Sequence, residues 1–259
     1  MKGLFLIGLF ATHNVTLPAE PAVKTKILLI GHKHDHPPQS HMYLEVCGML
    51  AKCLMQTPGV EAVVSDGWPT DPGVLKGVKA IVLYTSPGGT ILLDDAHRAE
   101  AEKLLREGVG YTAIHWATDA KPELGEAYLK VLGGWFHTDF SKLNTITSKL
   151  VQADPKHDIC RGWSDYESRE EFYLDLKFEP TVKPLVTATV DGKTQVVAWT
   201  YERPNSRKGR SFGTTLGHFY DTYRKDSFRR LLVNGILWTA HVKVPKEGAP
   251  CRTVEADFP

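Results

Sequence analysis

The sequence predicts an α/β fold in which helices cover both faces of a parallel sheet and a β-rich C-terminal half is added. From Thr25 to Gly134, apolar strand-like runs alternate with helix-like segments over short connections, a pattern typical of parallel sheets. From Leu143 onward, β-rich segments follow one another instead. A chain of 259 residues, of which 42% are hydrophobic, is long enough for one sizeable core.

The first half is expected to contain four strands and two helices. Apolar runs mark the strands at Ile27–Gly31, Val60–Ser65, Ala80–Thr85 and Gly110–His115. The first helix is expected over Ser40–Gln56, with Ser40 as a candidate N-cap. The second helix is expected over Asp94–Glu107 and is ended by Gly108.

The second half is expected to be rich in strands and to close with a helix. The β-rich segments are Asn144–Gln152, Phe172–Leu176, Leu185–Val190, Gln195–Tyr201 and Ser211–Leu216. Asp191-Gly192 stands between two of these runs and predicts a tight hairpin. Apolar residues at helical spacing predict an amphipathic helix over Asp226–Ala240.

These patterns suggest one domain over residues 25–245, with an irregular tail over 246–259. Residues 1–24 have two interpretations. Lys2 followed by an apolar run resembles a short secretory signal, which implies export to a periplasm, but no clean cleavage site follows the run. The alternative is an N-terminal extension of a cytoplasmic protein. The apolar run is too short to span a bilayer.

Composition excludes electrostatic nucleic-acid binding and favours a small polar ligand. The chain has 31 basic and 30 acidic residues and no long block of lysine or arginine. The four cysteines, Cys47, Cys53, Cys160 and Cys251, form no CxxC pair. They are therefore expected to be buried thiols rather than a disulfide pair or a zinc knuckle.

A cluster of histidines, Gly31-His32-Lys33-His34-Asp35-His36-Pro37-Pro38-Gln39-Ser40-His41, follows the first expected strand. Loops at such strand ends hold the ligands of α/β folds. His32, His34 and His36 alternate, so an extended chain would place them on one side, where they could bind a metal. The alternative is that they have helix-cap and surface roles.

Two further histidines end apolar strands. His115 stands at a sharp strand-to-helix corner before Trp116, where related hydrolases carry a nucleophile. Because neither serine nor cysteine is present there, an acyl-enzyme mechanism is not expected. His218 follows Gly217, whose backbone freedom is common in site loops. The alternatives are a packed His115 and a turn histidine at position 218.

Acidic and glycine-rich segments are weaker candidates. Adjacent Glu170 and Glu171 point to opposite faces of a strand, so at most one of them faces a site, and both could be surface residues. Gly88-Gly89 could present backbone N–H groups to a ligand or form a tight turn. Neither the Walker nor the GxGxxG pattern is present, which argues against nucleotide binding.

Several segments, taken in chain order, resemble the trehalose-utilization (ThuA-like) family over Lys26 to Pro245. They are Gly31-His32 with His36 and His41, Gly67-Trp68-Pro69, Gly110–His115, Gly133-Gly134, Glu171-Phe172-Tyr173, Ala198-Trp199, Gly209–Gly213, Gly217-His218-Phe219 and Asn234–Ala240. The resemblance implies a flavodoxin-like fold similar to class I glutamine amidotransferases. It places His115 where those enzymes have cysteine, and His218 near their histidine, so amidotransferase activity is not implied.

The resemblance also implies sugar metabolism, with a 3-keto sugar or glycoside made by a partner oxidoreductase as the substrate. Glu170 departs from the aspartate that the family often has before its glutamate, which leaves Glu171 and Tyr173 as the matching residues. We expect catalytic roles for His115, His218 and Glu171. Substrate-binding roles are expected for His32, His36, His41, Tyr173, Trp116, Gly88 and Gly89.

A divalent metal, zinc or manganese, is a candidate cofactor of this site, with His36, His115 and His218 as its expected ligands. The rival hypothesis is a non-catalytic carbohydrate-binding or scaffold module that keeps the fold.

Overall fold

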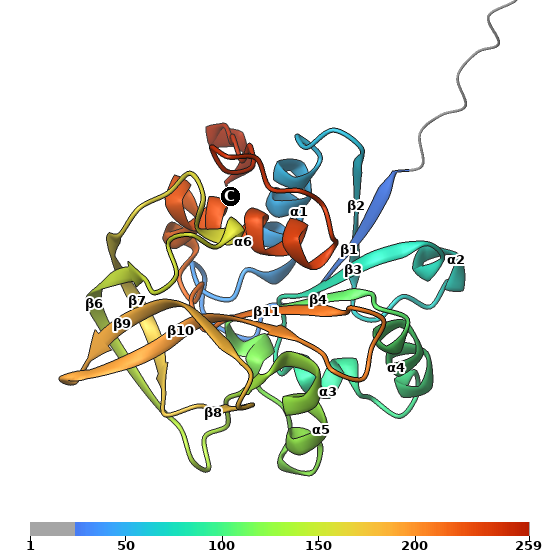
Figure 1. The fold of residues 1–259 in the computed structure, drawn as a ribbon, viewed down its shortest axis with the longest axis horizontal. Coiled ribbons are helices and arrows are strands. Elements are labelled where there is room, and N and C mark those ends of the chain that lie inside the picture. Colours follow the sequence, from blue (N-terminus) through green and yellow to red (C-terminus); the bar gives the residue numbers. More distant parts are fainter. Residues whose placement is uncertain (1–23, 259) are drawn as a thin grey trace, which may run out of the picture.

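The computed structural model describes residues 24–258, and a nine-stranded mixed sheet forms its centre (Figure 1). The strand order is β2-β1-β3-β4-β11-β10-β9-β6-β7. In chain order, the strands of this sheet are β1 (Thr25–Gly31), β2 (Val60–Asp66), β3 (Val78–Leu83), β4 (Gly110–Ile114), β6 (Lys142–Gln152), β7 (Tyr166–Leu174), β9 (Lys183–Val190), β10 (Lys193–Glu202) and β11 (Arg210–Thr214). A separate ribbon pairs β5 (Gly134–Trp135) with β8 (Lys177–Phe178).

The first part of the sheet is parallel, as expected. β1 pairs in parallel with β2 and with β3, and β3 pairs in parallel with β4. β11, which comes almost a hundred residues after β4, adds a further parallel strand to it. The parallel part therefore has five strands, one more than the four expected in the first half of the chain. The carboxyl ends of β1, β3, β4 and β11 lie at one edge of the sheet.

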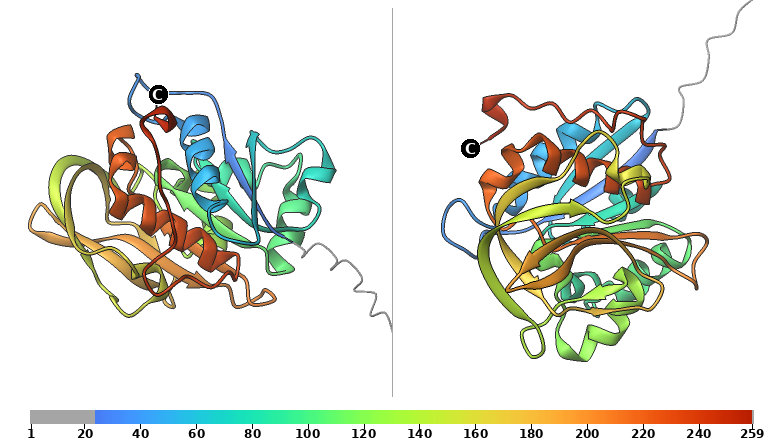
Figure 2. Two further views of the ribbon diagram at one scale, coloured as in Figure 1. Left: turned by 90° about the horizontal axis from the view of Figure 1, so that it is seen from above. Right: turned by 60° about the vertical axis from the view of Figure 1, so that its left-hand side comes forward.

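The second part of the sheet is antiparallel and confirms the β-rich half. β11, β10, β9, β6 and β7 pair in that order, and the Asp191-Gly192 turn joins β9 to β10 as predicted. Both turn residues have positive φ, 51° and 74°, which suits a tight hairpin. Figure 2 shows that this part curls, so that β6 and β7 bend away from the parallel strands.

Helices cover both faces of the parallel part, which confirms the α/β class (Figure 1). α1 (Tyr43–Leu54) and α6 (Asp226–Thr239) lie on one face, and α3 (Gly88–Leu92), α4 (Arg98–Arg106) and α5 (Pro122–Leu132) lie on the other. The shorter elements are α2 (Pro72–Leu75), η1 (His115–Thr118), η2 (Asp158–Cys160), η3 (Tyr220–Arg224) and η4 (Glu255–Asp257). Each face buries its own cluster of apolar side chains.

Two predicted helix boundaries are wrong. The predicted N-cap of the first helix, Ser40, does not cap it, because the chain turns inward through His41 and the helix begins only after Met42. The Ser40 hydroxyl instead donates to the carbonyl of Pro37. The helix predicted over Asp94–Glu107 is shorter, since the carboxylate of Asp94 accepts from the Ala96 amide and holds a turn before α4.

The four cysteines are buried free thiols, as predicted. The C-terminal segment packs across α1 and α6, where Lys52 pairs with Asp257 and the Ala249 amide donates to Asn234. No helix among residues 24–258 has the length and apolar character needed to cross a bilayer. The signal-like run within residues 1–24 lies outside the described residues.

Candidate functional site

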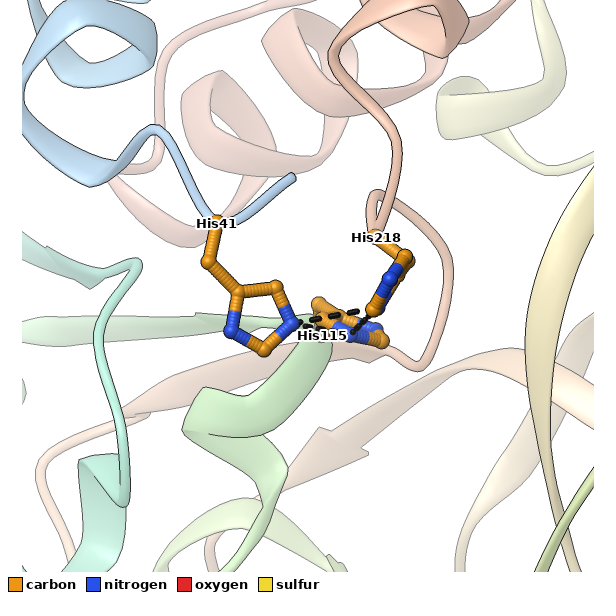
Figure 3. Close-up of side chains that lie close together, drawn as sticks. All are labelled: His41, His115 and His218. Carbon is orange, nitrogen blue, oxygen red and sulfur yellow. Dashed lines mark hydrogen bonds between the residues drawn. The ribbon is translucent and has the colours of Figure 1, made fainter. Parts of the chain in front are cut away.

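Three histidine side chains meet at the carboxyl edge of the parallel strands (Figure 3). His115 Nε2 lies 3.0 Å from His41 Nε2 and 3.0 Å from His218 Nδ1, and the latter two nitrogens are 3.1 Å apart. His41 and His115 are completely buried, and His218 is 9% exposed. We call these three residues the histidine triad. Each contributes one ring nitrogen to a common point.

The topology of the sheet brings the histidine triad together. His41 lies on the loop after β1, His115 directly follows β4, and His218 lies on the loop after β11. His41 and His115 have positive φ angles of 50° and 55°. Non-glycine residues seldom adopt this region, and such strain is typical of functional sites. The backbone therefore turns the imidazoles of His41 and His115 inward at a conformational cost.

Hydrogen bonds at the far ring nitrogens set the tautomers of two of these histidines. His115 Nδ1 donates to the carbonyl of Thr215 at 2.8 Å, because a carbonyl oxygen can only accept. His41 Nδ1 lies 3.0 Å from Asp35 Oδ1, which accepts its proton. The neutral forms of both rings therefore carry a lone pair on Nε2, and these two lone pairs face each other.

Glu171 and Tyr173 of β7 complete the site from the curled part of the sheet. Glu171 Oε2 lies 3.3 Å from His218 Nδ1 and 3.7 Å from His115 Nε2, and the Tyr173 hydroxyl lies 3.0 Å from His115 Nε2. Tyr173 can donate to His115, and His218 can donate to His41. Even so, Glu171 Oε2 stays buried without a hydrogen-bond partner among the described residues.

These donors suit a divalent cation. Tetrahedral zinc with bonds of about 2.0–2.1 Å needs ligand nitrogens roughly 3.3 Å apart, close to the observed separations. Imidazole nitrogens with a carboxylate oxygen are typical zinc ligands, and carboxylates also suit manganese. A cation would also give the buried Glu171 oxygen a counter-charge. The site therefore fits a metal held by His41, His115 and His218, with Glu171 beside it.

Asp35 and Tyr43 surround His41 on its outer side. Burial opposes ionisation of Asp35, but hydrogen bonds from His36, His41 and Tyr43 outweigh it and lower the pKa of this carboxyl. The Tyr43 hydroxyl donates to Asp35 Oδ2 at 2.9 Å. A carboxylate that orients a ligating imidazole is a common outer layer of metal sites.

Burial keeps His41 and His115 uncharged. It lowers the pKa of His41 to about 4, and the nearby ring of His36 adds to the effect. Burial also lowers the pKa of His115 well below its usual range, helped by repulsion from His41 and His218. Neutral imidazoles bind metals and accept protons, so both residues remain competent at neutral pH.

The metal-free protein is expected to lose stability as pH falls from about 6.5 to about 4. An unfolded His41 takes up a proton near pH 6.5, whereas the folded chain resists this until about pH 4. Stability from neutral His41 is thus present above pH 6.5 and is lost below it, by about 3 kcal/mol at 1.36 kcal/mol per pKa unit. Urea denaturation in EDTA near pH 7 and about pH 4.5 measures this loss.

In that experiment His41→Asn should reduce the pH dependence and leave the part that the buried His115 contributes, whereas the exposed control His34→Asn should keep the full dependence. An unchanged slope in His41→Asn would show that His41 does not contribute.

The structure does not bring every predicted site residue to the histidine triad. His36 lies beside it, with its ring 3.7 Å from that of His41, so the geometry favours His41 rather than His36 as the third nitrogen donor. His32 is exposed and pairs with Asp66 at 2.7 Å. Trp116 flanks the site, its ring 5.4 Å from those of His36 and His41.

The predicted glycine pair, Gly88 and Gly89, packs against the helical turn η1 that contains His115. Gly88 and Gly89 begin α3, and a Cβ on Gly88 would come within 2.6 Å of Ala117 in the helical turn that follows His115. The Gly89 amide donates to the Asp119 carbonyl at 2.8 Å. These glycines allow close packing against that turn and do not face the histidine nitrogens.

No sequence pattern indicated a role for Asp35, Tyr43 or Thr215, and Glu170 did not match the family pattern. Glu170 is completely buried, and burial raises the pKa of its carboxyl to about 7, against the effect of hydrogen bonds from the Gly217 and His218 amides. The surface interpretation of this acidic pair is therefore wrong. The available signal was the alternation of side chains along β7, which places Glu170 and Glu171 on opposite faces of the strand.

Comparisons with known proteins agree with the fold. The profile of a family described as trehalose utilisation matches residues 26–239. A ThuA-like structure from Bacteroides uniformis has a TM-score of 0.63 at 19% identity, covering 91% of this chain and 99% of its own. One from Parabacteroides merdae has a TM-score of 0.61 at 19% identity, with the same coverage.

A glutamine amidotransferase from Thermotoga maritima also shares the fold. Its TM-score is 0.51 at 11% identity, and the match covers 83% of this chain and 98% of that one. No curated protein matches the sequence.

Proposed function

Since this chain belongs to the ThuA (trehalose utilisation) family, we propose that it acts on a sugar or 3-keto glycoside by acid–base chemistry at the histidine triad. One observation carries the proposal. Glu171 Oε2 is buried without a hydrogen-bond partner among the described residues, 3.3 Å from His218 Nδ1. A buried carboxylate oxygen beside imidazole nitrogens is a candidate base that can accept a proton or a cation.

We propose that His41, His115 and His218 hold a divalent metal, zinc or manganese. When bound, such an ion polarises a carbonyl or hydroxyl oxygen of the sugar. Asp35 orients the His41 ring through Nδ1, and the Thr215 carbonyl orients His115 in the same way. The protein thereby fixes which ring nitrogens face the proposed metal position.

Glu171 is the proposed general base. In a 3-keto glycoside the carbonyl at C3 acidifies the hydrogen on C2. The carboxylate takes this proton, the C2–H electron pair forms a C1–C2 double bond, and the C1–oxygen bond breaks. The same proton then returns to the leaving sugar oxygen, so the step is balanced. Burial raises the pKa of Tyr173, whose hydroxyl therefore stays protonated and can donate to the substrate oxyanion.

A sugar oxidoreductase is the proposed functional partner, because it would oxidise the ordinary glycoside to the 3-keto form. His32, His36 and Trp116 lie on or beside the loops around the histidine triad and are proposed to contact the sugar. Aromatic rings suit the apolar faces of sugar rings.

The test is turnover of 3-keto-trehalose by protein whose metal content has been measured, with unoxidised trehalose as the control. Conversion of the keto sugar alone, with about one zinc or manganese ion per chain, supports the proposal. Binding without conversion favours the rival carbohydrate-binding module. The metal would be abandoned if the native protein held no stoichiometric ion and added zinc or manganese changed neither Tm nor turnover.

A further inference from the structure

The loop that carries His218 is fixed by a buried carboxylate beneath it. The backbone amides of Gly217 and His218 donate to Glu170 Oε2 at 3.2 and 3.3 Å. Glu170 is completely buried, so water does not compete for these bonds. Oε2 can accept both bonds whether the carboxyl is ionised or protonated, because a protonated carboxyl keeps acceptor capacity. Glu170 is therefore a main attachment point of this loop.

Other contacts leave the loop little freedom around that attachment. The hydroxyls of Tyr84 and Tyr223 donate to the Gly217 carbonyl at 2.7 and 3.2 Å. Gly217 has a φ of 107°, and a Cβ there would lie 2.5 Å from the Tyr223 hydroxyl. The amide of Gly217 is thus hydrogen-bonded to Glu170 and its carbonyl to the two tyrosines, in a backbone conformation that favours glycine.

Two successive residues of β7, Glu170 and Glu171, lie next to His218, one at its backbone and the other at its ring. Glu170 accepts from the His218 backbone, and Glu171 lies 3.3 Å from the His218 ring. Side chains alternate across a strand, so one carboxylate reaches the buried side of the loop and the next reaches the site. The position of β7 therefore sets the His218 backbone and the proposed base together.

We propose that Glu170 is a positioning residue that holds the His218 loop so that Nδ1 faces His41 and His115. This inference rests on the proposed function for its effect on metal binding, but not for its effect on the loop. Without Glu170, two buried amides lose their acceptor, and the loop must move to find another. His218 Nδ1 then leaves the common point.

The experiment compares the full chain with Glu170→Ala, Glu170→Gln and Leu185→Ala. The Gln side chain keeps an oxygen that can accept from both amides. Leu185 is a buried core residue of β9, which pairs with β10 and β6 and not with β11, so its truncation lowers stability at a strand that does not lead into the loop. Two readouts are measured, namely hydrogen exchange of the 215–219 segment in EDTA, and the affinity and visible spectrum of bound Co²⁺.

Glu170→Ala is expected to speed exchange of this segment about tenfold. It should also weaken Co²⁺ binding by about 10- to 100-fold, with an altered spectrum. Glu170→Gln should stay within about threefold of the wild type in both readouts. Leu185→Ala should lower Tm but leave the Co²⁺ affinity and spectrum unchanged.

Unchanged exchange and Co²⁺ affinity in Glu170→Ala would overturn the inference, and so would equal losses in Leu185→Ala. If the wild type bound no Co²⁺, the proposed metal would fall instead. In that case the exchange data from metal-free protein still decide whether Glu170 holds the loop.

Discussion

Replacing His115 by alanine is expected to weaken metal binding by about 300- to 8,000-fold, if roughly 10–16 kcal/mol of binding is shared among the three histidine ligands. His115 Nε2 is the nitrogen that lies closest to both other histidines of the triad and to Tyr173. Its removal deletes a ligand and leaves the Tyr173 hydroxyl without its histidine neighbour. Turnover of the keto sugar should fall with the metal content.

Metal analysis and isothermal titration with Zn²⁺ measure this loss. His34→Ala is the matched control, because His34 is an exposed histidine that pairs with Glu45 and lies away from the histidine triad. It should bind metal like the wild type. His218→Ala should weaken Zn²⁺ binding in the same way, although His218 is less deeply buried than His115. A folded His115→Ala protein with wild-type Zn²⁺ affinity would contradict the proposed site.

Replacing Glu171 by glutamine is expected to lower kcat on 3-keto-trehalose by about 10²- to 10⁴-fold, the usual contribution of a general base. Glutamine has nearly the same shape but cannot take up the proton. The histidine triad supplies its nitrogens without Glu171, so the metal content should remain near that of the wild type. KM should change little, because the lost interaction belongs to the transition state.

Steady-state kinetics and metal analysis on the same preparation test this prediction. Glu167→Gln provides the control, since Glu167 is an exposed glutamate of the same strand and should leave kcat unchanged. Full turnover by Glu171→Gln would remove Glu171 as the base. Loss of the metal together with turnover would instead make Glu171 a ligand.

Much of the fold could be predicted from local patterns. Strand β1 and the β9–β10 hairpin follow directly from apolar runs and from the Asp191-Gly192 turn. A buried strand needs consecutive apolar side chains, and a two-residue hairpin needs residues that tolerate positive φ. Both requirements are met within a few residues, so they can be read without knowledge of the rest of the chain.

The pairing of strands that lie far apart in the chain could not be predicted from local sequence patterns. β11 was predicted only as one of several β-rich segments, yet it pairs in parallel with β4. The same type of residue suits an antiparallel strand, so composition cannot choose the neighbour. That pairing brings the His218 loop beside His115, and the curl of the antiparallel strands brings Tyr173 within 3.0 Å of the same ring.

The loop from Gly31 to His41 is not the extended chain that the alternating histidines suggested. Alternation groups His32, His34 and His36, but positive φ values at Gln39 and His41 turn the chain inward and bury His41 instead. His34 pairs with Glu45 on the outside. A backbone turn of this kind depends on contacts with a distant loop, such as the hydrogen bond from the His41 amide to the His218 carbonyl.

Local apolar patterns were enough to predict the fold class, the strand ends that carry His115 and His218, and the burial of the cysteines. Contacts between distant segments were needed to establish which nitrogens meet, which tautomers they adopt, and that Glu170 lies beneath the His218 loop. Those features depend on distances of a few ångströms between segments far apart in the chain. Local sequence carries no measure of such distances, and the packing of the whole sheet sets them.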